Sequence, residues 1–167
     1  MLRSYRADLL GGDAHAVKVE DGKRTEWNEH LEVTPGRTFG GLGLVYAVKN
    51  LRERLRGGKE LELRGVLMIP KPMAGPMKVR LAGREVIVVG GRRVAADKIE
   101  LRPPVGPLEK VLAKLKDPPG FDVWVHADDP PMMLRTRQPL FEPKDPVVRL
   151  DTLPYAPPRS RQARVPH

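Results

Sequence analysis

The stretch that decides the fold is Met77–Leu101, which reads "MKVRLAGREVIVVGGRRVAADKIEL". Its first residues alternate between apolar and polar side chains, which is the period of a strand with one face in the core. Residues 84–89, "REVIVV", are apolar on both faces, as in a strand that is central or covered on both sides. Gly90-Gly91 then turns the chain into the segment 92–101. The stretch therefore predicts consecutive strands joined by a tight turn.

Two further strand patterns lie before this stretch. In 15–33, "HAVKVEDGKRTEWNEHLEV", Asp21-Gly22 suits the two-residue type I′ turn of a β-hairpin, because that turn needs positive φ angles. The second strand of the hairpin alternates between an apolar and a polar face. In 59–69, "KELELRGVLMI", leucines recur on one side of a strand, and 70–76, "PKPMAGP", is expected to be a loop. The apolar face of the hairpin consists of Thr25, Trp27, Leu31 and Val33.

Residues 42–55, between these strands, have the period of a helix. Apolar side chains recur there at three- and four-residue steps, which predicts a stripe that faces the core. Gly57-Gly58 suits the end of this helix, since glycine adopts the left-handed conformation of a C-terminal cap. The expected stripe consists of Leu42, Val45, Val48, Leu51 and Leu55. The residues expected on the solvent side are Lys49, Arg52, Glu53 and Arg56.

The C-terminal half continues the pattern of short elements. A second short helix is expected in 103–120, where Leu108, Val111, Leu112 and Leu115 share one face. The segment 121–137, "FDVWVHADDPPMMLRTR", predicts a hairpin with "ADDPP" as its connection, and 147–153 predicts a last strand. We therefore expect one α+β domain, mostly β, over residues 1–153. Residues 154–167 are rich in Pro and Arg and are expected to form a disordered tail.

The composition restricts the core and the chemistry. Aromatic residues make up only 5% of the chain, so the core must consist mainly of Val, Leu, Ile, Met and Ala. The absence of cysteine excludes disulfides, thiolate zinc sites and thiol nucleophiles. No apolar run approaches the ~20 residues that span a bilayer, so we expect no transmembrane segment. The first residues, "MLRSYRADLL", have no signal-peptide core, which indicates a cytoplasmic protein or the start of a chain cut from a longer precursor.

The formal net charge of +9 favours an anionic partner such as nucleic acid or lipid head groups. An excess of arginine on solvated faces is the simpler interpretation. Tyr46 is the one aromatic residue near the basic end of the predicted helix, which argues against nucleic acid as a partner, because single-strand readers stack bases on aromatic rings. The candidate contacts for anions at this helix end are Lys49, Arg52, Arg54, Arg56 and Lys59.

His126, Asp128 and Asp129 lie close together in the sequence, and one imidazole with two carboxylates can bind a divalent metal. Adjacent aspartates point apart, however, and two acids followed by two prolines are typical of a hairpin connection. The serines lie near the termini, where a nucleophile is hard to position. We therefore expect no catalytic residue, no metal ligand and no cofactor, and predict that the protein is not an enzyme.

Three motifs in the order found here resemble a bacterial domain-of-unknown-function family of exported, β-rich envelope proteins. They are a helix of the type "LGLVYAVKNLRER", the strand pair "LAGREVIVV" and "GGRRVAADKIEL", and a hairpin of the form VWV-x-x-DD-x-P, together covering about residues 38–150. The resemblance implies a strongly curved antiparallel sheet with helices on its concave side, similar to lipoprotein-carrier folds that hold apolar ligands. It also implies a location in the periplasm and a structural role for Trp124, Asp128 and Asp129.

From these observations we expect a non-catalytic binding or accessory protein of the bacterial cell envelope. Its partner would be an apolar ligand, a lipid or another, lipid-modified envelope protein, held between the sheet and the helices. The alternatives are a basic protein that binds nucleic acid or an anionic surface, and a metal-assisted hydrolase at His126. Methionines suit an adaptable apolar groove because their side chains are flexible. The candidate groove residues are Trp124, Met68, Met77, Met132 and Tyr46.

Overall fold

The structure is a computed structural model that describes residues 2–68, 71–102, 121–128, 130–139 and 145–152. The predicted helix within 103–120 and the predicted tail, 154–167, lie outside the described residues. Among the residues that it does describe, no helix is both long enough and apolar enough to cross a bilayer.

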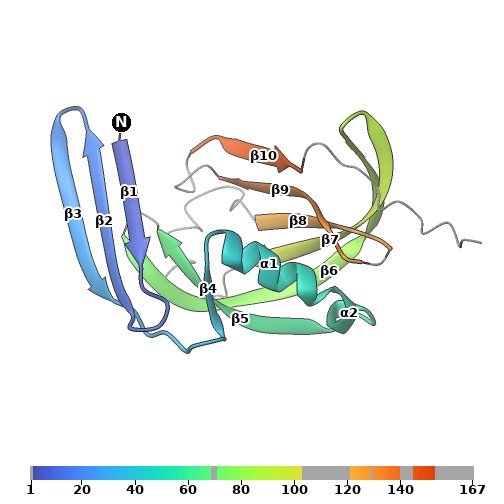
Figure 1. Cartoon of the computed structure of the whole chain (residues 1–167), viewed down its shortest axis with the longest axis horizontal. Helices are drawn as coiled ribbons and strands as arrows, with labels where there is room; N and C mark the ends of the chain where they lie inside the picture. The colour runs from blue at the N-terminus through green and yellow to red at the C-terminus, as the bar shows by residue number, and fades with distance from the viewer. Residues whose placement is uncertain (1, 69–70, 103–120, 129, 140–144, 153–167) are drawn as a thin grey trace, which may run out of the picture.

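The first three strands form a small antiparallel sheet in the order β1, β2, β3 (Figure 1). Asp21 and Gly22 join β2 to β3 with φ angles of 51° and 75°, so the predicted type I′ turn is confirmed. The predicted faces of β3 are confirmed too, because Thr25 and Trp27 are half-buried while their neighbours in the strand are exposed. The three strands are β1 Leu2–Ala7, β2 Asp13–Glu20 and β3 Lys23–His30.

The other described strands form a seven-stranded sheet that curls into a half-barrel around the helix α1, Leu42–Asn50 (Figure 1). From β5 onward each strand pairs antiparallel with the next, and β4 pairs parallel with β5. The predicted fold, mostly β with a curved antiparallel sheet and short helices, is confirmed. The strands are β4 Thr38–Gly40, β5 Glu60–Met68, β6 Pro72–Val89, β7 Arg92–Arg102, β8 Phe121–His126, β9 Met133–Pro139 and β10 Val147–Asp151.

Strand β6 is 18 residues long and includes most of the predicted loop at 70–76. That prediction is wrong from Pro72 onward, because this part of β6 pairs with the end of β5. The pairing with β7 extends only to Lys78, so among the described residues the start of β6 has a strand partner on one side. Prolines are tolerated on such an edge because no ladder hydrogen bond is lost. A register shift after Leu81 then bends the strand, which contributes to the curl of the sheet.

Strand β6 is central in the strand order, which is one of the two predicted alternatives, but its apolar end is covered on one face and not on both. Ile87 and Val89 are 7% and 0% exposed, whereas Val86 and Val88 are 57% and 55% exposed. The buried pair packs with Trp124 in a small cluster on the side of the sheet opposite to α1. The hairpin of β6 and β7 therefore has one face in a core and one face in water.

The predicted helix is divided into α1 (Leu42–Asn50) and α2 (Arg52–Leu55). The buried side of α1 differs from the predicted stripe, since Leu44 is 4% exposed and Leu42 is 64% exposed. The expectation that Arg52 faces solvent is also wrong, because its side chain is 1% exposed. Arg52 and Leu55 of α2 lie four and seven residues after the buried Val48, so they continue the buried side of α1.

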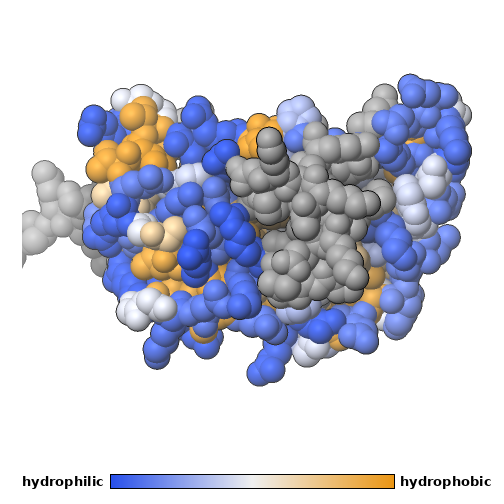
Figure 2. Space-filling view, turned by 180° about the vertical axis from the view of Figure 1, so that it is seen from behind, coloured by the Kyte–Doolittle hydropathy of each residue, from blue (hydrophilic) through white to orange (hydrophobic). Residues whose placement is uncertain are grey.

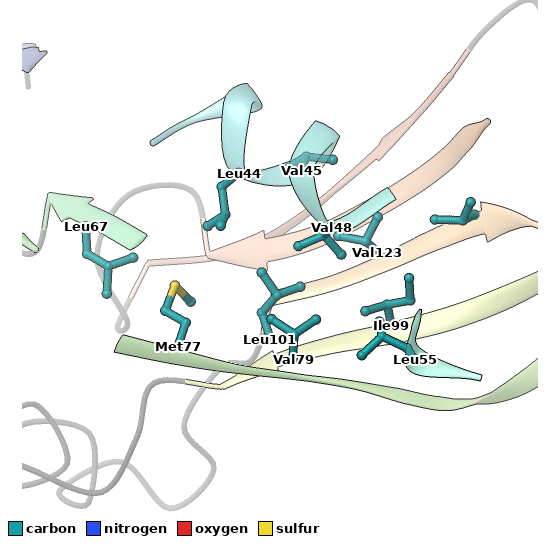
Figure 3. Close-up of a cluster of buried hydrophobic side chains, with 11 residues drawn as sticks. Leu44, Val45, Val48, Leu55, Leu67, Met77, Val79, Ile99, Leu101 and Val123 are labelled. Carbon is teal, nitrogen blue, oxygen red and sulfur yellow. The ribbon is translucent and has the colours of Figure 1, made fainter. Parts of the chain in front are cut away.

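The main core lies between the helices and the face of the large sheet that carries them, which we call the inner face (Figure 3). The opposite side of the same sheet is called the outer face. Gly65 of β5 leaves space for Met77 of β6, because a Cβ atom at position 65 would collide with the Met77 thioether. The buried core residues are Leu44, Val45, Val48, Leu55, Leu67, Met77, Val79, Ile99, Leu101, Val123 and Val125.

The small sheet contacts the large sheet through a separate apolar cluster. Val66 of β5 is buried against Ala14 of β2 and against Leu31, which follows β3. Arg3 of β1 also donates a hydrogen bond of 3.0 Å to Asp145, which precedes β10. These contacts join both ends of the predicted domain, 1–153, whose boundaries remain a prediction.

Candidate functional site

A cavity of about 310 Å³ lies between α1 and the inner face of the large sheet. Small-molecule sites in proteins occupy about 300–1,000 Å³, so this cavity is at the lower end of that range. Both sheets and α1 contribute to it. The described lining residues are Tyr5, Gly41, Leu42, Leu44, Val45, Val66, Leu67, Leu101, Phe121, Asp122, Val123, Thr136, Gln138, Pro139 and Leu150.

Most of the lining is apolar and comes from the main core. Leu44 and Val45 project from α1, and Leu67, Leu101 and Val123 project from three strands of the sheet (Figure 3). All five side chains are 9% exposed or less. Strand residues alternate between the two faces of a sheet, which places the three strand residues on the inner face. The cavity is therefore a gap in the core, with walls that favour an apolar ligand.

A few polar groups border the same cavity. The hydroxyl of Tyr5, the hydroxyl of Thr136 and the amide of Gln138 can each form a hydrogen bond with a ligand. Thr136 is 5% exposed, so its hydroxyl belongs to the interior. Asp122 also borders the cavity, but the alternation along β8 directs its carboxylate to the outer face, where Lys98 Nζ lies 3.4 Å away.

The rim of the cavity is unusually apolar for an exposed surface. Leu42 at the start of α1 and Leu150 of β10 both line the cavity, yet they are 64% and 53% exposed. Tyr46, which is 54% exposed, lies one turn along α1 from Leu42 and so shares its side of the helix. Among the described residues, the rim between α1 and β10 is therefore formed by exposed apolar side chains.

The structure places the sequence-predicted groove residues elsewhere. None of the four that can be located lines the cavity: Met77 is 1% exposed in the main core, and Met132 is half-buried in the connection from β8 to β9. Tyr46 lies near the rim, and Trp124 is on the outer face. The side chain of Met68 is outside the described part of the chain. The residues that line the cavity come from distant segments of the chain. The sequence therefore indicated a groove between sheet and helix but not the residues that line it.

Trp124 has a defined environment on the outer face. It is 7% exposed, and its indole Nε1 donates a hydrogen bond to the Glu85 carboxylate. Lys98 Nζ lies 5.5 Å from the centroid of the indole ring, and Arg135 Cζ lies 6.0 Å from it. These distances suit cation–π contacts. Trp124 therefore anchors the outer cluster and is separated from the cavity by the sheet.

The predicted anion contacts at the helix end fall into two groups, those that bond the protein backbone and those that do not. Arg52 Nη1 donates to the backbone oxygens of His126 and Asp128 at 2.6 and 3.1 Å, and Arg56 donates to that of Ala127 at 3.2 Å. These two arginines hold the connection from β8 to β9, so their guanidinium groups face the protein. Arg54 and Lys59 are exposed and Lys49 is half-buried, and their role as anion contacts stays a prediction.

The stretch His126–Asp128 leads from β8 into the connection to β9, as the hairpin prediction requires. The His126 Nδ1 atom accepts a hydrogen bond of 3.1 Å from the Asp128 backbone N–H, an interaction within the turn. Asp129 lies outside the described residues. Across the described ranges, no three His, Cys, Asp or Glu side chains converge in a way that could hold a metal ion.

Sequence reasoning missed the charges of the outer face. Arg80, Lys98 and Arg102 surround Glu100, which is 8% exposed. Burial alone would raise the pKa of the Glu100 carboxyl, but the Arg80 hydrogen bond and the charges of Arg102 and Lys98 bring that pKa below its ordinary value. The alternation of these charged residues along each strand was visible in the sequence, but the residues with which they pair on neighbouring strands were not.

A second such carboxyl lies further along the sheet. The Arg135 hydrogen bond, at 2.6 Å, lowers the pKa of the Asp151 carboxyl against the opposing effect of burial. Arg149 Nε is 3.7 Å from the other Asp151 oxygen. Glu100 and Asp151 are thus kept in the charged state by the arginines beside them.

Comparison of the chain with protein-family models, curated proteins and solved structures gave no match in any of the three, so its likeness to an envelope-protein family rests on the sequence motifs.

Proposed function

We propose that this chain is a non-catalytic binding protein that holds an apolar ligand, or the acyl chain of a lipid-modified partner, in the cavity between α1 and the large sheet. The observation that carries the proposal is the gap of about 310 Å³ inside the main core, lined by buried apolar side chains. A location in the bacterial envelope follows from the motif resemblance and belongs to the same proposal.

The polar groups of the cavity favour a neutral ligand. Tyr5, Thr136 and Gln138 offer hydroxyl and amide groups, which can bond a ligand hydroxyl or carbonyl. Among the described lining residues there is no Lys or Arg that could neutralise a free carboxylate. We therefore expect a fatty alcohol or an acyl ester to bind better than the fatty acid of the same chain length.

The energetic gain comes from the apolar chain. Each methylene group that leaves water contributes ~0.8 kcal/mol. Loss of translational and rotational freedom opposes this gain by about 4 kcal/mol or more. A short chain therefore binds weakly, and affinity is expected to rise with chain length until the cavity is full.

The test measures binding of the neutral fluorescent probe N-phenyl-1-naphthylamine and its displacement by dodecanol and by dodecanoate. Val45→Phe places a larger side chain in the cavity wall, and Val86→Phe adds the same side chain on the exposed hairpin as a matched control. We expect Val45→Phe to abolish probe binding and Val86→Phe to retain it. Thermal melting of both variants checks that they fold.

Two results would contradict the proposal. One is probe binding that is equal in wild type and in folded Val45→Phe, since the probe would then bind elsewhere. The other is displacement by dodecanoate at lower concentration than by dodecanol, which would refute the neutral-ligand expectation. If Val45→Phe does not fold, Thr136→Val can replace it, because this substitution keeps the volume of the cavity wall nearly unchanged. It should weaken displacement of the probe by dodecanol and leave displacement by dodecanoate unchanged.

A further inference from the structure

The outer face of the large sheet carries a group of cations that neither the cavity nor the core uses. The pairs Arg80–Glu100, Glu100–Asp122 and Asp122–Arg137 are direct cross-strand neighbours, so the group crosses the four strands β6 to β9. Neighbouring strands are ~4.8 Å apart, which gives the group a width of about 15 Å. We call it the cationic face. Its cations are Arg80, Lys98, Arg102 and Arg137, and its carboxylates are Glu100 and Asp122.

The carboxylates of the cationic face lie deeper than the cations. The side chains of Glu100 and Asp122 are 10% and 7% exposed, whereas those of Arg80 and Arg137 are 59% and 57% exposed. Four cations over two carboxylates leave two positive charges in excess; beside them on β5, Glu60 is the cross-strand neighbour of Arg80 and pairs with Lys78. A molecule that approaches from solvent therefore meets guanidinium groups, with the negative charge screened beneath them. Figure 2 views the molecule from behind and shows that its coloured residues are mostly hydrophilic.

The ion pairs within the cationic face leave donors available. Arg80 binds Glu100 at 2.7 Å, but Arg102 and Arg137 are each 3.9 Å from Asp122, which is too long for a hydrogen bond. Arg102 Nη1 and Asp122 Oδ1, which face each other at 3.9 Å, are both buried and have no hydrogen-bond partner in the described structure. The exposed guanidinium group of Arg137 can therefore donate hydrogen bonds to an oxygen of an anionic ligand that approaches from solvent.

We propose that the cationic face binds the phosphate backbone of a nucleic-acid strand without reading its sequence. The proposal is independent of the cavity, which lies on the other side of the sheet, and of the envelope location, which rests on the motif resemblance. Arginine is suited to this contact because its planar group bonds phosphate oxygens with two N–H groups at once.

Shape and composition decide between the possible polyanions. The large sheet is strongly curled (Figure 1), so its outer face would touch a flat bilayer over a narrow band. A flexible nucleic-acid strand, in contrast, can follow the curve of the sheet. Trp124 is the aromatic residue described on this face, and at 7% exposed beneath Lys98 and Arg135 it cannot stack on a base. The contacts would therefore be to phosphate alone, which gives affinity without sequence preference.

The experiment uses fluorescence anisotropy with labelled oligothymidine and oligoadenosine of about 20 nucleotides at salt concentrations between about 50 and 200 mM. For four phosphate contacts on a single strand we expect a plot of log K against log salt with a slope of about −3. The two sequences should bind equally. A lack of binding at the lowest salt would overturn the proposal.

Two triple variants separate the cationic face from the general charge of the protein. Replacement of Arg80, Arg102 and Arg137 by Gln should weaken binding at low salt at least about tenfold and reduce the salt slope by about two. Replacement of Lys49, Arg54 and Lys59 by Gln removes the same charge at the helix end and should leave the slope nearly unchanged. Equal losses in both variants, or a larger loss in the helix-end variant, would overturn the assignment to the outer face.

A single variant keeps the test valid if the triple variant does not fold. Glu100→Gln removes one of the carboxylates beneath the cations, so it should strengthen binding, whereas a purely structural network predicts weaker binding or no change. Vesicles with and without anionic lipid provide the last arm. Binding to anionic vesicles at salt where oligonucleotides do not bind would show that the partner is a membrane surface, and would overturn the proposal.

Discussion

The inner and outer faces of the large sheet are made by the same strands, yet they have opposite chemistry. On the inner face Val79, Ile99 and Val123 pack under α1 and leave a cavity, whereas their immediate neighbours on the outer face carry charge. Strand alternation alone produces this division, because adjacent residues point to opposite sides. The difference teaches that a sheet of this size can present two chemically different surfaces, one apolar and one ionic, without a second domain.

The largest effect is expected from Trp124→Ala, which tests whether the outer face is only a charged surface. Trp124 is buried with Ile87, Val89 and Leu134 in a core of its own. Loss of a buried aromatic side chain costs about 3–5 kcal/mol, so the free energy of unfolding in urea should fall by that amount. Trp27→Ala, at a half-buried tryptophan of the small sheet, is the control and should cost less. An equal loss in both variants would contradict the assignment of an outer core.

A smaller effect is expected from Arg52→Met, which tests how the helices are fixed on the inner face. The substitution keeps apolar packing but removes the hydrogen bonds to the backbone oxygens of His126 and Asp128. Hydrogen bonds from a charged donor contribute about 1.5–3 kcal/mol each, and we expect a net loss of about 2–3 kcal/mol in urea unfolding. Arg54→Met, on the exposed side of α2, should stay within about 0.5 kcal/mol of wild type.

Acid should remove the stability that the outer-face carboxylates Glu100 and Asp151 contribute. Glu100 and Asp151 have pKa values below their ordinary ones in the folded protein, so the unfolded chain binds more protons as pH falls. Their contribution to stability is complete above the unfolded pKa values, near 4.5 and 3.8, and is lost as pH falls through the folded values. Urea unfolding between about pH 6 and pH 3 should show this loss. Glu100→Gln should flatten the profile, and Glu62→Gln, at an exposed residue, should not.

The smallest effect is expected from His126→Ala, which tests the hairpin interpretation of "HADD". The imidazole forms a hydrogen bond within the turn, so its loss should cost within about 0.5 kcal/mol in thermal melting. Divalent metal should leave the melting temperature unchanged. A metal that bound only the folded state at 100 times its Kd would add about 2.7 kcal/mol, and such a shift would contradict the turn interpretation.

Local sequence signals predicted the local structure well. Asp21-Gly22 specifies its turn through backbone conformation alone, and the alternation in β3 needs no partner to be read. The fold class followed from such signals. They failed where a distant segment decides the outcome: Pro72 is in a strand because β5 lies beside it, and Arg52 is buried because the β8–β9 connection accepts its hydrogen bonds.

The candidate site was predicted only in outline. A groove between sheet and helix was expected, but its walls combine Tyr5, Val45 and Thr136, which no spacing in the sequence connects. Val86 and Val88 illustrate the same limit, because an apolar sequence pattern does not show which face of a strand will be covered by other residues. The charged network was hidden for a similar reason, because Arg80 meets Glu100 only after β6 and β7 pair.

The hydrogen bond between Arg3 and Asp145 has a consequence for the order of folding. It joins residues that are 142 positions apart, whereas most strand pairs of the large sheet connect neighbours in the chain. Closing so long a loop is entropically unfavourable until the intervening chain is already compact. We therefore expect this contact to be absent from the transition state. Arg3→Gln should accelerate unfolding in stopped-flow measurements and leave the folding rate almost unchanged. Such a result would show that the contact forms after the transition state, when the rest of the fold is already in place.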